Sequence, residues 1–442
     1  MSLSHFHLKL ISLAAAAWTL PAWGQDTPAV DTNPDDSPTR EFTHIEPQDS
    51  KPTVRAITPI DDNHVLFLNK RGQIGVAKFS PGLSLIGWDY YSEVYLDTLP
   101  SIAAGPGFSA LVASPTELTQ AFDTNQDLDL DFFQALLRDW PGRDQGVIIT
   151  AGPVADQYGR VLVALSPIAA TEGEPAKATV IAWHPAAKEP VTVTESILPI
   201  TAMALSADGR LAARLSMPDY KEGYYISLSD LPPFDAENPD AAPGSIPMTN
   251  PSLLIPSELT KAADPTQIAF FREDGIEKLL AVCPGTKGIV EIVPEAVNGG
   301  WQGAMLLREI SPEPIETLVE MSPNLLIGGG DSGFVPIGKN EEVFRISRVT
   351  PAADGLVINF TKPIDRFAAV KPENYTVTEV SLQGGLSTTT ATPVIESDGR
   401  TVILKLDDFK SETVLRVVCQ NVPSESGETL LNPQVFYKVH KP

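Results

Sequence analysis

Residues 160–166 read RVLVALS, an apolar run long enough for one strand, and the turn sequence DQYG precedes them at 156–159. Five similar runs occur along the chain: HVLFLN (64–69), SALVAS (109–114), RLAARLS (210–216), KLLAVC (278–283) and NLLIGG (324–329). The runs align on Val65, Leu111, Val161, Leu211, Leu279 and Leu325, roughly 46, 50, 50, 68 and 46 residues apart. This spacing is typical of β-propeller blades, so residues 51–343 are predicted to form a six-bladed β-propeller.

Most of the runs are followed at hairpin distance by a second apolar strand, as in KRGQIGVAKF (70–79), KEGYYISL (221–228) and TKGIVEIV (286–293). Such units bury their apolar faces only when neighbouring units are present. The wide fourth interval contains PPFDAENPDAAPGS (232–245), which is expected to be a surface loop. A two-sheet sandwich is the alternative fold, although its strands need not recur at so long a period. The best helical candidate is DFFQALLRDW (131–140).

A different pattern begins near Phe344. Alternating strand-like segments separated by turns fill the last 100 or so residues: ISRVTPAADGLVINFTKPID (346–365), ENYTVTEVSL (373–382), DGRTVILKLDDF (398–409), TVLRVVCQNV (413–422) and FYKVHK (436–441). This pattern is typical of an immunoglobulin-like or fibronectin-like β-sandwich. Residues 344–442 are therefore predicted to form a separate domain, and the whole protein is predicted to be all-β.

The N-terminus has the features of an export signal. Lys9 precedes the apolar stretch from Leu10 to Leu20, and a small residue, Gly24, ends the segment, so residues 1–24 are predicted to be a cleaved signal peptide. Residues 25–50 are rich in Pro, Asp, Ser and Thr and are predicted to be a disordered leader. The mature protein is expected in the periplasm or outside the cell, and no later run is long enough for an integral membrane protein.

The charge of the chain argues against nucleic acid as a partner. The sequence has 32 basic and 56 acidic residues, a formal net charge of −24, and phosphate binding needs clustered Lys and Arg. Cys283 and Cys419 lie in the apolar runs LLAVC and LRVVC, which favours two buried thiols, although two cysteines of an exported protein could also pair. The chain has no CxxCH motif, so no covalently attached haem is expected.

Several segments, taken in order, resemble a known group of proteins. They are LVASPTELTQAFDTNQDLDLDFFQALLRDW (111–140), GPVADQYGRVLVALS (152–166), ALSADGRL (204–211), VNGGWQGA (297–304), LLIGGGDSG (325–333) and GLVINFTKPID (355–365). The chain resembles exported propeller proteins of Planctomycetes and Verrucomicrobia that are related to glucose/sorbosone dehydrogenases. The resemblance implies a six-bladed quinoprotein-type propeller. Enzymes of that superfamily use pyrroloquinoline quinone and calcium, often beside a haem domain.

The sequence departs from that pattern in its histidines. Sugar oxidation of this kind needs a general base that takes the hydroxyl proton while hydride passes to the quinone, and His usually serves. After signal cleavage only His44, His64, His184 and His440 remain, and neither His64 nor His184 lies in a context like that of the family's catalytic histidine. The catalytic and cofactor-binding residues therefore stay unassigned.

Arginines could hold the carboxylates of a quinone, and Arg138, Arg160 and Arg210 are the candidates. Their turn-like contexts favour surface ion pairs instead. Trp301 and Gln302 in VNGGWQGA could line a sugar-binding groove, although a packed turn between blades is the favoured interpretation. The run GGGDSG (328–333) lacks the Lys-Ser/Thr and the helix of a phosphate loop and is interpreted as a glycine-rich turn.

The sharpest local motif is DTNQDLDLD, which places acidic or amide side chains at Asp123, Asn125, Asp127, Asp129 and Asp131. Calcium prefers six to eight hard oxygen ligands, and a D-x-[DN]-x-D loop brings several carboxylates to one point. Leu128 stands where such loops often carry glycine, and Gln134 replaces the expected bidentate Glu. The motif is either a calcium site or a solvated acidic loop that caps a helix at Asp131.

These observations favour an exported binding or interaction module, for carbohydrate or for another envelope protein, without catalytic activity. A quinone-dependent sugar or aldose dehydrogenase is the first alternative, and a structural cell-envelope protein is the second.

Overall fold

The computed structural model describes residues 51–440 except for a set of short gaps. The gaps are 91–100, 106–108, 125–129, 169–176, 217–222, 232, 236, 239–247, 249–252, 261–266, 274, 284–286, 298–299, 310–312, 323–324, 338–342, 381–385 and 408–412. The predicted signal peptide (1–24) and leader (25–50) lie outside the described residues. Within the described part of the chain, no helix is both long and apolar enough to cross a membrane.

The described residues form almost only antiparallel strands, as the sequence predicts. Three consecutive four-stranded sheets come first. Their strands are β1 (Ala56–Pro59), β2 (His64–Leu68), β3 (Ile74–Phe79) and β4 (Leu85–Tyr90); β5 (Ser101–Ala104), β6 (Ala110–Ser114), β7 (Glu117–Phe122) and β8 (Phe132–Leu137); and β9 (Val147–Ala155), β10 (Val161–Pro167), β11 (Ala178–Trp183) and β12 (Val191–Ser196). A 3-10 turn, Arg143–Gln145, precedes β9.

Three further sets of strands follow in the same up-and-down order. They are β13 (Ile200–Leu205), β14 (Arg210–Leu215), β15 (Gly223–Asp230) and β16 (Leu253–Pro256); β17 (Gln267–Glu273), β18 (Ile276–Val282), β19 (Gly288–Val297) and β20 (Gly300–Glu309); and β21 (Thr317–Ser322), β22 (Leu325–Gly330) and β23 (Gly333–Ile337). The short helix α1 (Ser257–Thr260) follows β16. Each of the six aligned runs forms the second strand of its set, β2, β6, β10, β14, β18 or β22, so the period found in the sequence is the period of the sheets.

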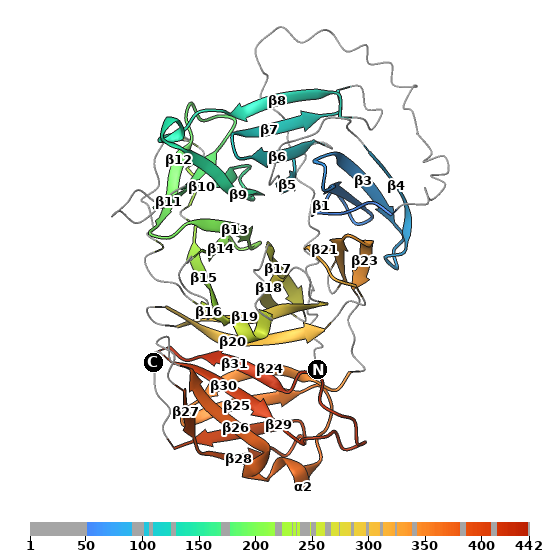
Figure 1. Ribbon diagram of the computed structural model, residues 1–442, viewed down its shortest axis with the longest axis vertical. Helices are drawn as coiled ribbons and strands as arrows, with labels where there is room; N and C mark the ends of the chain where they lie inside the picture. Colours follow the sequence, from blue (N-terminus) through green and yellow to red (C-terminus); the bar gives the residue numbers. More distant parts are fainter. Residues whose placement is uncertain are drawn as a thin grey trace, which may run out of the picture. The chain divides into compact units, whose positions relative to one another are not determined.

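The sheets form a closed ring. Their first strands, β1, β5, β9, β13, β17 and β21, contact one another in that order, and β21 contacts β1 (Figure 1). Separate apolar clusters fill the spaces between neighbouring sheets. This arrangement is a β-propeller, in which the apolar faces of each sheet are covered by the next one.

The ring closes at a glycine-rich turn. The backbone N–H of Val54 donates to the carbonyl of Gly330 (3.0 Å), and the Val54 side chain lies directly on Gly329. A Cβ at Gly329 would stand 2.4 Å from Val54 Cγ1, which leaves no room for a side chain. The interpretation of GGGDSG as a turn is confirmed, since Gly330 pairs with Gly333 across the β22–β23 hairpin. Its glycines also let the start of the ring pack on its last sheet.

The prediction of a helix over residues 131–140 is wrong. Residues 132–137 form β8, which pairs with β7 from Phe122 opposite Phe132 to Leu118 opposite Leu137. The N–H of Asp131 donates to the carbonyl of Phe122 (3.0 Å) and so extends the strand ladder, where a helix cap was expected. Pairing with the open edge of β7 outweighs the helical pattern, and two adjacent Phe residues favour a strand.

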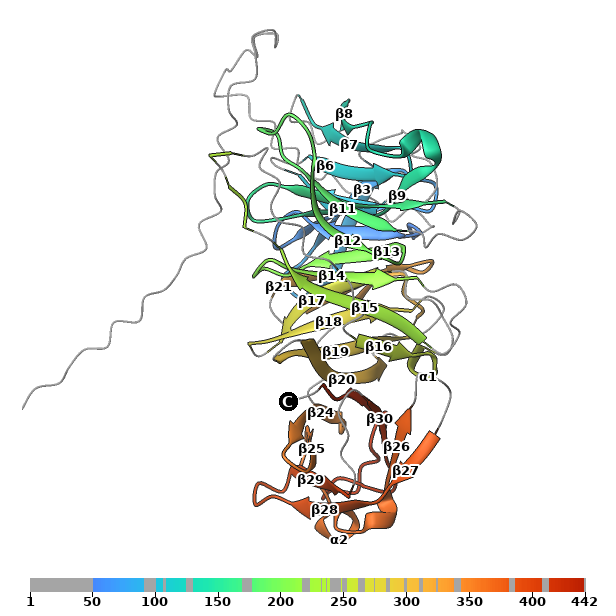
Figure 2. The same cartoon turned by 90° about the vertical axis from the view of Figure 1, so that its left-hand side faces the viewer.

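The C-terminal residues form two facing sheets (Figure 2). One contains β24 (Ile346–Ala352), β25 (Gly355–Phe360), β29 (Thr401–Leu406) and β28 (Ala391–Ile395), and the other contains β31 (Gln434–Lys438), β30 (Val414–Cys419), β26 (Tyr375–Val380) and β27 (Leu386–Thr389). The helix α2 (Arg366–Ala369) and the 3-10 turn Pro372–Asn374 precede β26.

The two facing sheets are joined to the ring by shared hydrogen bonds. β31 pairs with β20, from Gly303 opposite Lys438 to Leu306 opposite Val435, so one sheet of eight strands runs through both parts. Ala304 and Leu306 of β20 belong to the C-terminal core. Cys283 and Cys419 are both buried thiols and lie in different cores, the first in the ring and the second between the C-terminal sheets. Burial raises the pKa of the Cys419 thiol to about 12.

Four charged side chains are buried in the sheet that the ring shares with the C-terminal part. Lys278 Nζ lies 2.6 Å from both Glu273 and Glu291, and Arg308 lies 3.2 and 3.0 Å from the same two carboxylates. None of the four residues is more than 8% exposed. The alternating charges form a closed square, so each buried charge has two opposite neighbours, as burial of charge requires.

We predict that Lys278→Met destabilises the protein by about 3–5 kcal/mol, because it leaves two buried carboxylates with one partner each. Lys405→Met is the matched control, since Lys405 and Asp354 form an exposed pair 3.3 Å apart and its loss should cost less than about 1 kcal/mol. Urea denaturation followed by tryptophan fluorescence measures both. Equal free energies of unfolding for the two variants would show that the square contributes nothing.

The same square predicts acid sensitivity. Burial alone raises the pKa of Glu273, but Lys278 and Arg308 outweigh it and lower the pKa from 4.5 to about 2. Because the folded-state pKa is the lower one, this carboxylate stabilises the fold above pH 4.5, and that contribution is lost as the pH falls toward about 2. The free energy of unfolding, measured by urea denaturation across this range, should fall less steeply in Glu273→Gln than in the natural chain. Identical slopes would contradict the assignment.

Candidate functional site

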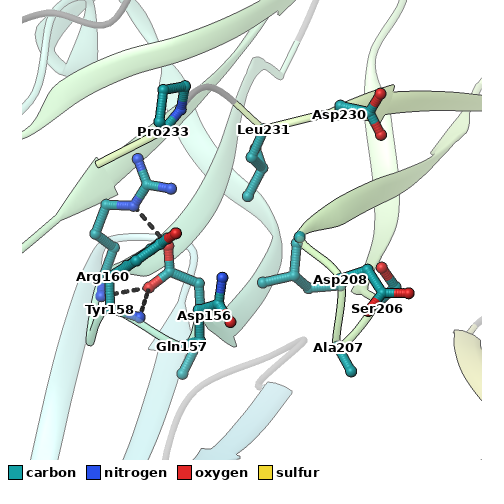
Figure 3. A pocket seen from close by; sticks show the side chains of 13 residues that line it. Asp156, Gln157, Tyr158, Arg160, Ser206, Ala207, Asp208, Asp230, Leu231 and Pro233 are labelled. Atoms are coloured by element: carbon teal, nitrogen blue, oxygen red, sulfur yellow. Dashed lines mark hydrogen bonds and ion pairs between the residues drawn. The ribbon is translucent and has the colours of Figure 1, made fainter. Parts of the chain in front are cut away.

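A cavity of about 360 Å³ lies where turns of two neighbouring ring sheets meet (Figure 3). Its walls come from the turn after β9 (155–160), the turn after β13 (205–209) and the stretch that follows β15 (230–233). The first two turns connect the innermost strand of a sheet to its second strand. Its volume lies within the range of about 300–1,000 Å³ that is usual for small-molecule sites.

The turn after β9 is built around the carboxylate of Asp156. Its Oδ1 accepts from the backbone N–H groups of Tyr158 and Arg160, both at 2.9 Å, and its Oδ2 accepts from Arg160 Nε at 2.6 Å. The two side chains are only 4% and 2% exposed. Asp at the first position of such a turn satisfies the backbone donors that follow it, and here it also neutralises the buried Arg160.

Aromatic rings enclose the guanidinium of Arg160. Its Cζ lies 5.7 Å from the centre of the Tyr158 ring and 5.4 Å from that of Phe234. Phe234 in turn lies 4.6 Å from the ring of His184. Burial lowers the pKa of His184 more than the Tyr158 backbone and Asp156 raise it. On this side of the cavity, the rings of Tyr158 and Phe234 pack on the Arg160 guanidinium and hold the Asp156–Arg160 ion pair in place.

The opposite side of the cavity carries two exposed carboxylates. Asp208 and Asp230 have side chains 67% and 80% exposed. Asp208 lies 2.9 Å from Arg272 of the next sheet, whereas Asp230 lies 3.8 Å from Arg210 Nε, beyond hydrogen-bond distance. Both carboxylates are therefore accessible to a ligand in solution.

Behind this wall, charged groups connect the fourth and fifth sheets. Arg210 donates to Glu277 and stacks over Trp301, with its Cζ 4.6 Å from the ring centre. Arg272 approaches Glu277 to 3.7 Å. Burial raises the pKa of Glu277, and Asp208 adds to that effect, against the attraction of Arg210 and Arg272. The contacts hold the turn after β13 against β17 and β18.

The structure assigns ordinary roles to most of the residues that the sequence analysis considered. Arg138 forms an exposed ion pair with Glu117 at 2.6 Å, as expected for a surface arginine. Arg160 was expected at the surface and is instead among the largest fully buried side chains, because Asp156 neutralises it inside the turn. Trp301 packs on the core of the ring, and Gln302 is buried and donates to Glu295, so both side chains are packed as expected. They lie on β20, in the β19–β20 hairpin of one sheet, and not in a turn between blades.

The three histidines that the structure describes lie in separate parts of the fold. The Nδ1 atom of His64 lies 2.9 Å from both carboxylate oxygens of Asp61, three residues earlier in the turn after β1. His184 Nδ1 accepts from the N–H of Ala186 (3.1 Å), and the ring of His440 packs against Gly300. His44 lies outside the described residues.

Only the ends of the predicted calcium loop are described. Asn125, Asp127 and Asp129 lie outside the described residues, while Asp123 and Asp131 are at its two ends. Both carboxylate oxygens of Asp131 accept from the hydroxyl of Thr124 at 2.8 Å, which holds the ends together. No group of three potential metal ligands occurs among the side chains that the structure describes. The choice between a calcium site and a solvated loop therefore stays a prediction.

Of the residues that line the cavity, the sequence reasoning considered Arg160 alone as a candidate. It treated DQYG (156–159) as a turn signal and 232–245 as a surface loop, although Pro233 of that loop lines the cavity and Phe234 packs on Arg160. The available signal was the recurrence of a capping residue followed four positions later by Arg, in Asp156–Arg160 and Ser206–Arg210. In both turns the first side chain accepts from the N–H of that Arg, at 2.9 Å.

Comparison with known proteins assigns no family to the chain. No protein-family model matches the chain, and no curated protein matches it. Similar solved structures include the putative oxidoreductase (glucose dehydrogenase) of Thermus thermophilus, with 14% identity, a TM-score of 0.43 and coverage of 63% of this chain and 90% of that one. Another, described as glucose dehydrogenase, has 14% identity, a TM-score of 0.43 and coverage of 66% and 97%.

The pyranose dehydrogenase PQQ domain of Coprinopsis cinerea is also similar, with 10% identity, a TM-score of 0.41 and coverage of 65% of this chain and 92% of that one. At these identities and TM-scores, the likeness gives no assignment of individual residues.

We predict that calcium, if bound at residues 123–131, raises the melting temperature and that a chelator reverses the rise, because an ion that binds only the folded state stabilises it. A combined Asp123→Asn and Asp131→Asn variant should lose the rise, and Asp354→Asn in the C-terminal part should keep it. Thermal unfolding followed by circular dichroism measures the shift. An unchanged melting temperature would leave the solvated acidic loop as the explanation.

Proposed function

We propose that the protein is an exported binding module without catalytic activity, in which a six-bladed propeller is followed by an immunoglobulin-like sandwich and the cavity between the turns after β9 and β13 holds a carbohydrate. The closed order of contacts among six first strands supports the blade count. The two facing C-terminal sheets support the sandwich. The cavity is the observation on which the function depends.

The lining of the cavity suits a sugar. Tyr158 is 43% exposed and offers an aromatic face on which the C–H surface of a pyranose can pack. Carboxylates accept strongly from hydroxyl groups, and Asp208 and Asp230 are exposed enough to receive them. The Asp156–Arg160 pair and its stacked rings keep the other side rigid, so binding would order few side chains there.

No described histidine lines the cavity to serve as the general base of a sugar oxidation. Hydride transfer from a sugar needs a general base within hydrogen-bond reach of the hydroxyl proton. The His184 ring packs on Phe234, His64 belongs to a turn in the first sheet, and neither histidine is among the residues that line the cavity. A quinone-dependent dehydrogenase and a purely structural envelope protein are the two alternatives that the experiment distinguishes.

We predict that Tyr158→Ala weakens sugar binding about tenfold, because it removes the aromatic face, whereas Tyr158→Phe retains it. Phe132→Ala on β8 is the matched control, since Phe132 is 52% exposed and lies outside the cavity. Calorimetric titration of the purified full chain with a panel of monosaccharides and disaccharides measures binding. Equal affinities for Tyr158→Ala and Phe132→Ala would place any bound sugar elsewhere.

The same preparation tests the alternatives. Dye reduction over the sugar panel in the presence of pyrroloquinoline quinone and calcium would establish the dehydrogenase and overturn the proposal of a non-catalytic module. A chain that neither turns over nor binds any sugar would favour the structural role.

A further inference from the structure

We propose that the cavity selects a sugar that carries an ammonium group, an inference that rests on the proposed function and specifies its ligand. The cavity has two unlike sides. Tyr158 is on the same side as the neutralised Asp156–Arg160 pair, while Asp208 and Asp230 lie on the opposite side (Figure 3). A ligand that fits both sides has an apolar face and a positively charged edge.

The positive charge in the cavity wall is already neutralised. Among the described lining residues Arg160 is the one cation, and its Nε donates to Asp156 at 2.6 Å within the turn. An anionic sugar would therefore meet a neutral ion pair on one side and two carboxylates on the other. The repulsion disfavours sugar acids and sugar phosphates.

The two carboxylates are only partly compensated by their neighbours. Arg272, the partner of Asp208, is shared with Glu277, and neither Arg210 nor Arg272 lines the cavity. Arg210 is already bound to Glu277, and its buried Nε makes no hydrogen bond, with Asp230 Oδ1 3.8 Å away. Arg210 therefore makes no hydrogen bond to Asp230, and the Asp230 carboxylate can accept hydrogen bonds from an ammonium group.

The shape of the wall favours a sugar over a small inorganic cation. Leu231 and Pro233 add apolar surface to the lining that contains Tyr158. Apolar surface offers a hydrated ion no hydrogen-bond acceptor or ligand atom. A pyranose ring can cover this surface and place its ammonium group toward Asp208 and Asp230. Charge-assisted hydrogen bonds to these carboxylates would then distinguish the amine from a hydroxyl at the same ring position.

Three sugars of similar size test the proposal by calorimetric titration of the full chain at about pH 6, where the amine of glucosamine is protonated. Glucosamine should bind about tenfold more tightly than glucose or N-acetylglucosamine, which lack the charge. Glucuronate should bind more weakly than glucose. The preference for glucosamine should shrink in high salt, because the two carboxylates are exposed.

The combined Asp208→Asn and Asp230→Asn variant keeps the side-chain shapes and removes both charges. Glucose, which these carboxylates contact through its hydroxyl groups, should bind somewhat more weakly, and glucosamine should lose much more affinity, so most of the preference for glucosamine should disappear. Asp354→Asn should leave both affinities unchanged. Equal binding of glucose and glucosamine, abolished by Tyr158→Ala, would overturn this inference and leave the proposed function intact. Binding of no sugar at all would overturn both, and a glucosamine preference that persists in the combined variant would place the ammonium site elsewhere.

Discussion

The closure of the ring at Val54 is the contact on which the rest of the structure depends. Each sheet leaves apolar faces that only its neighbours cover, so an open row of sheets would expose two of them. The Val54 hydrogen bond to Gly330 and the ion pairs of Lys70 with Glu316 and Asp331 join the first sheet to the last. Phe334 of the last sheet also packs edge-on against Phe67 of the first, with ring centres 5.3 Å apart.

The side-by-side packing of neighbouring sheets also creates the candidate site. The cavity belongs to no single sheet, because its walls are turns of the third and fourth sheets that meet only when the first strands are packed side by side. The charged contacts of Arg210 and Arg272 then fix the fourth sheet against the fifth. A site between repeated units depends on the packing of the sheets, which brings the turns together, and the side chains on those turns then determine what binds.

The sequence predicted the fold well, because propeller units bury their strands at a fixed period. The six runs around Val65, Val161 and their equivalents are apolar for that reason, and each forms the second strand of its sheet. It failed at β8, where local pattern favoured a helix and pairing with β7 decided otherwise. The sequence also did not predict that β31 pairs with β20, because the patterns of two strands about 130 residues apart do not indicate that they pair.

The candidate site was harder to predict than the fold. Asp156 and Asp208 occupy turn positions where Asp is common for backbone reasons, so their residue types alone indicate no ligand. The burial of Arg160 and the packing of Phe234 on its guanidinium depend on how distant turns meet. Sequence patterns therefore specified the turns and left open which of them face one another.

A crystal structure of the protein grown with glucosamine tests the central claim most directly. The account predicts a closed ring of six sheets and electron density for the sugar between the Tyr158 ring and the carboxylates of Asp208 and Asp230. A ring open between β1 and β21, or a cavity that stays empty at saturating sugar, would contradict it.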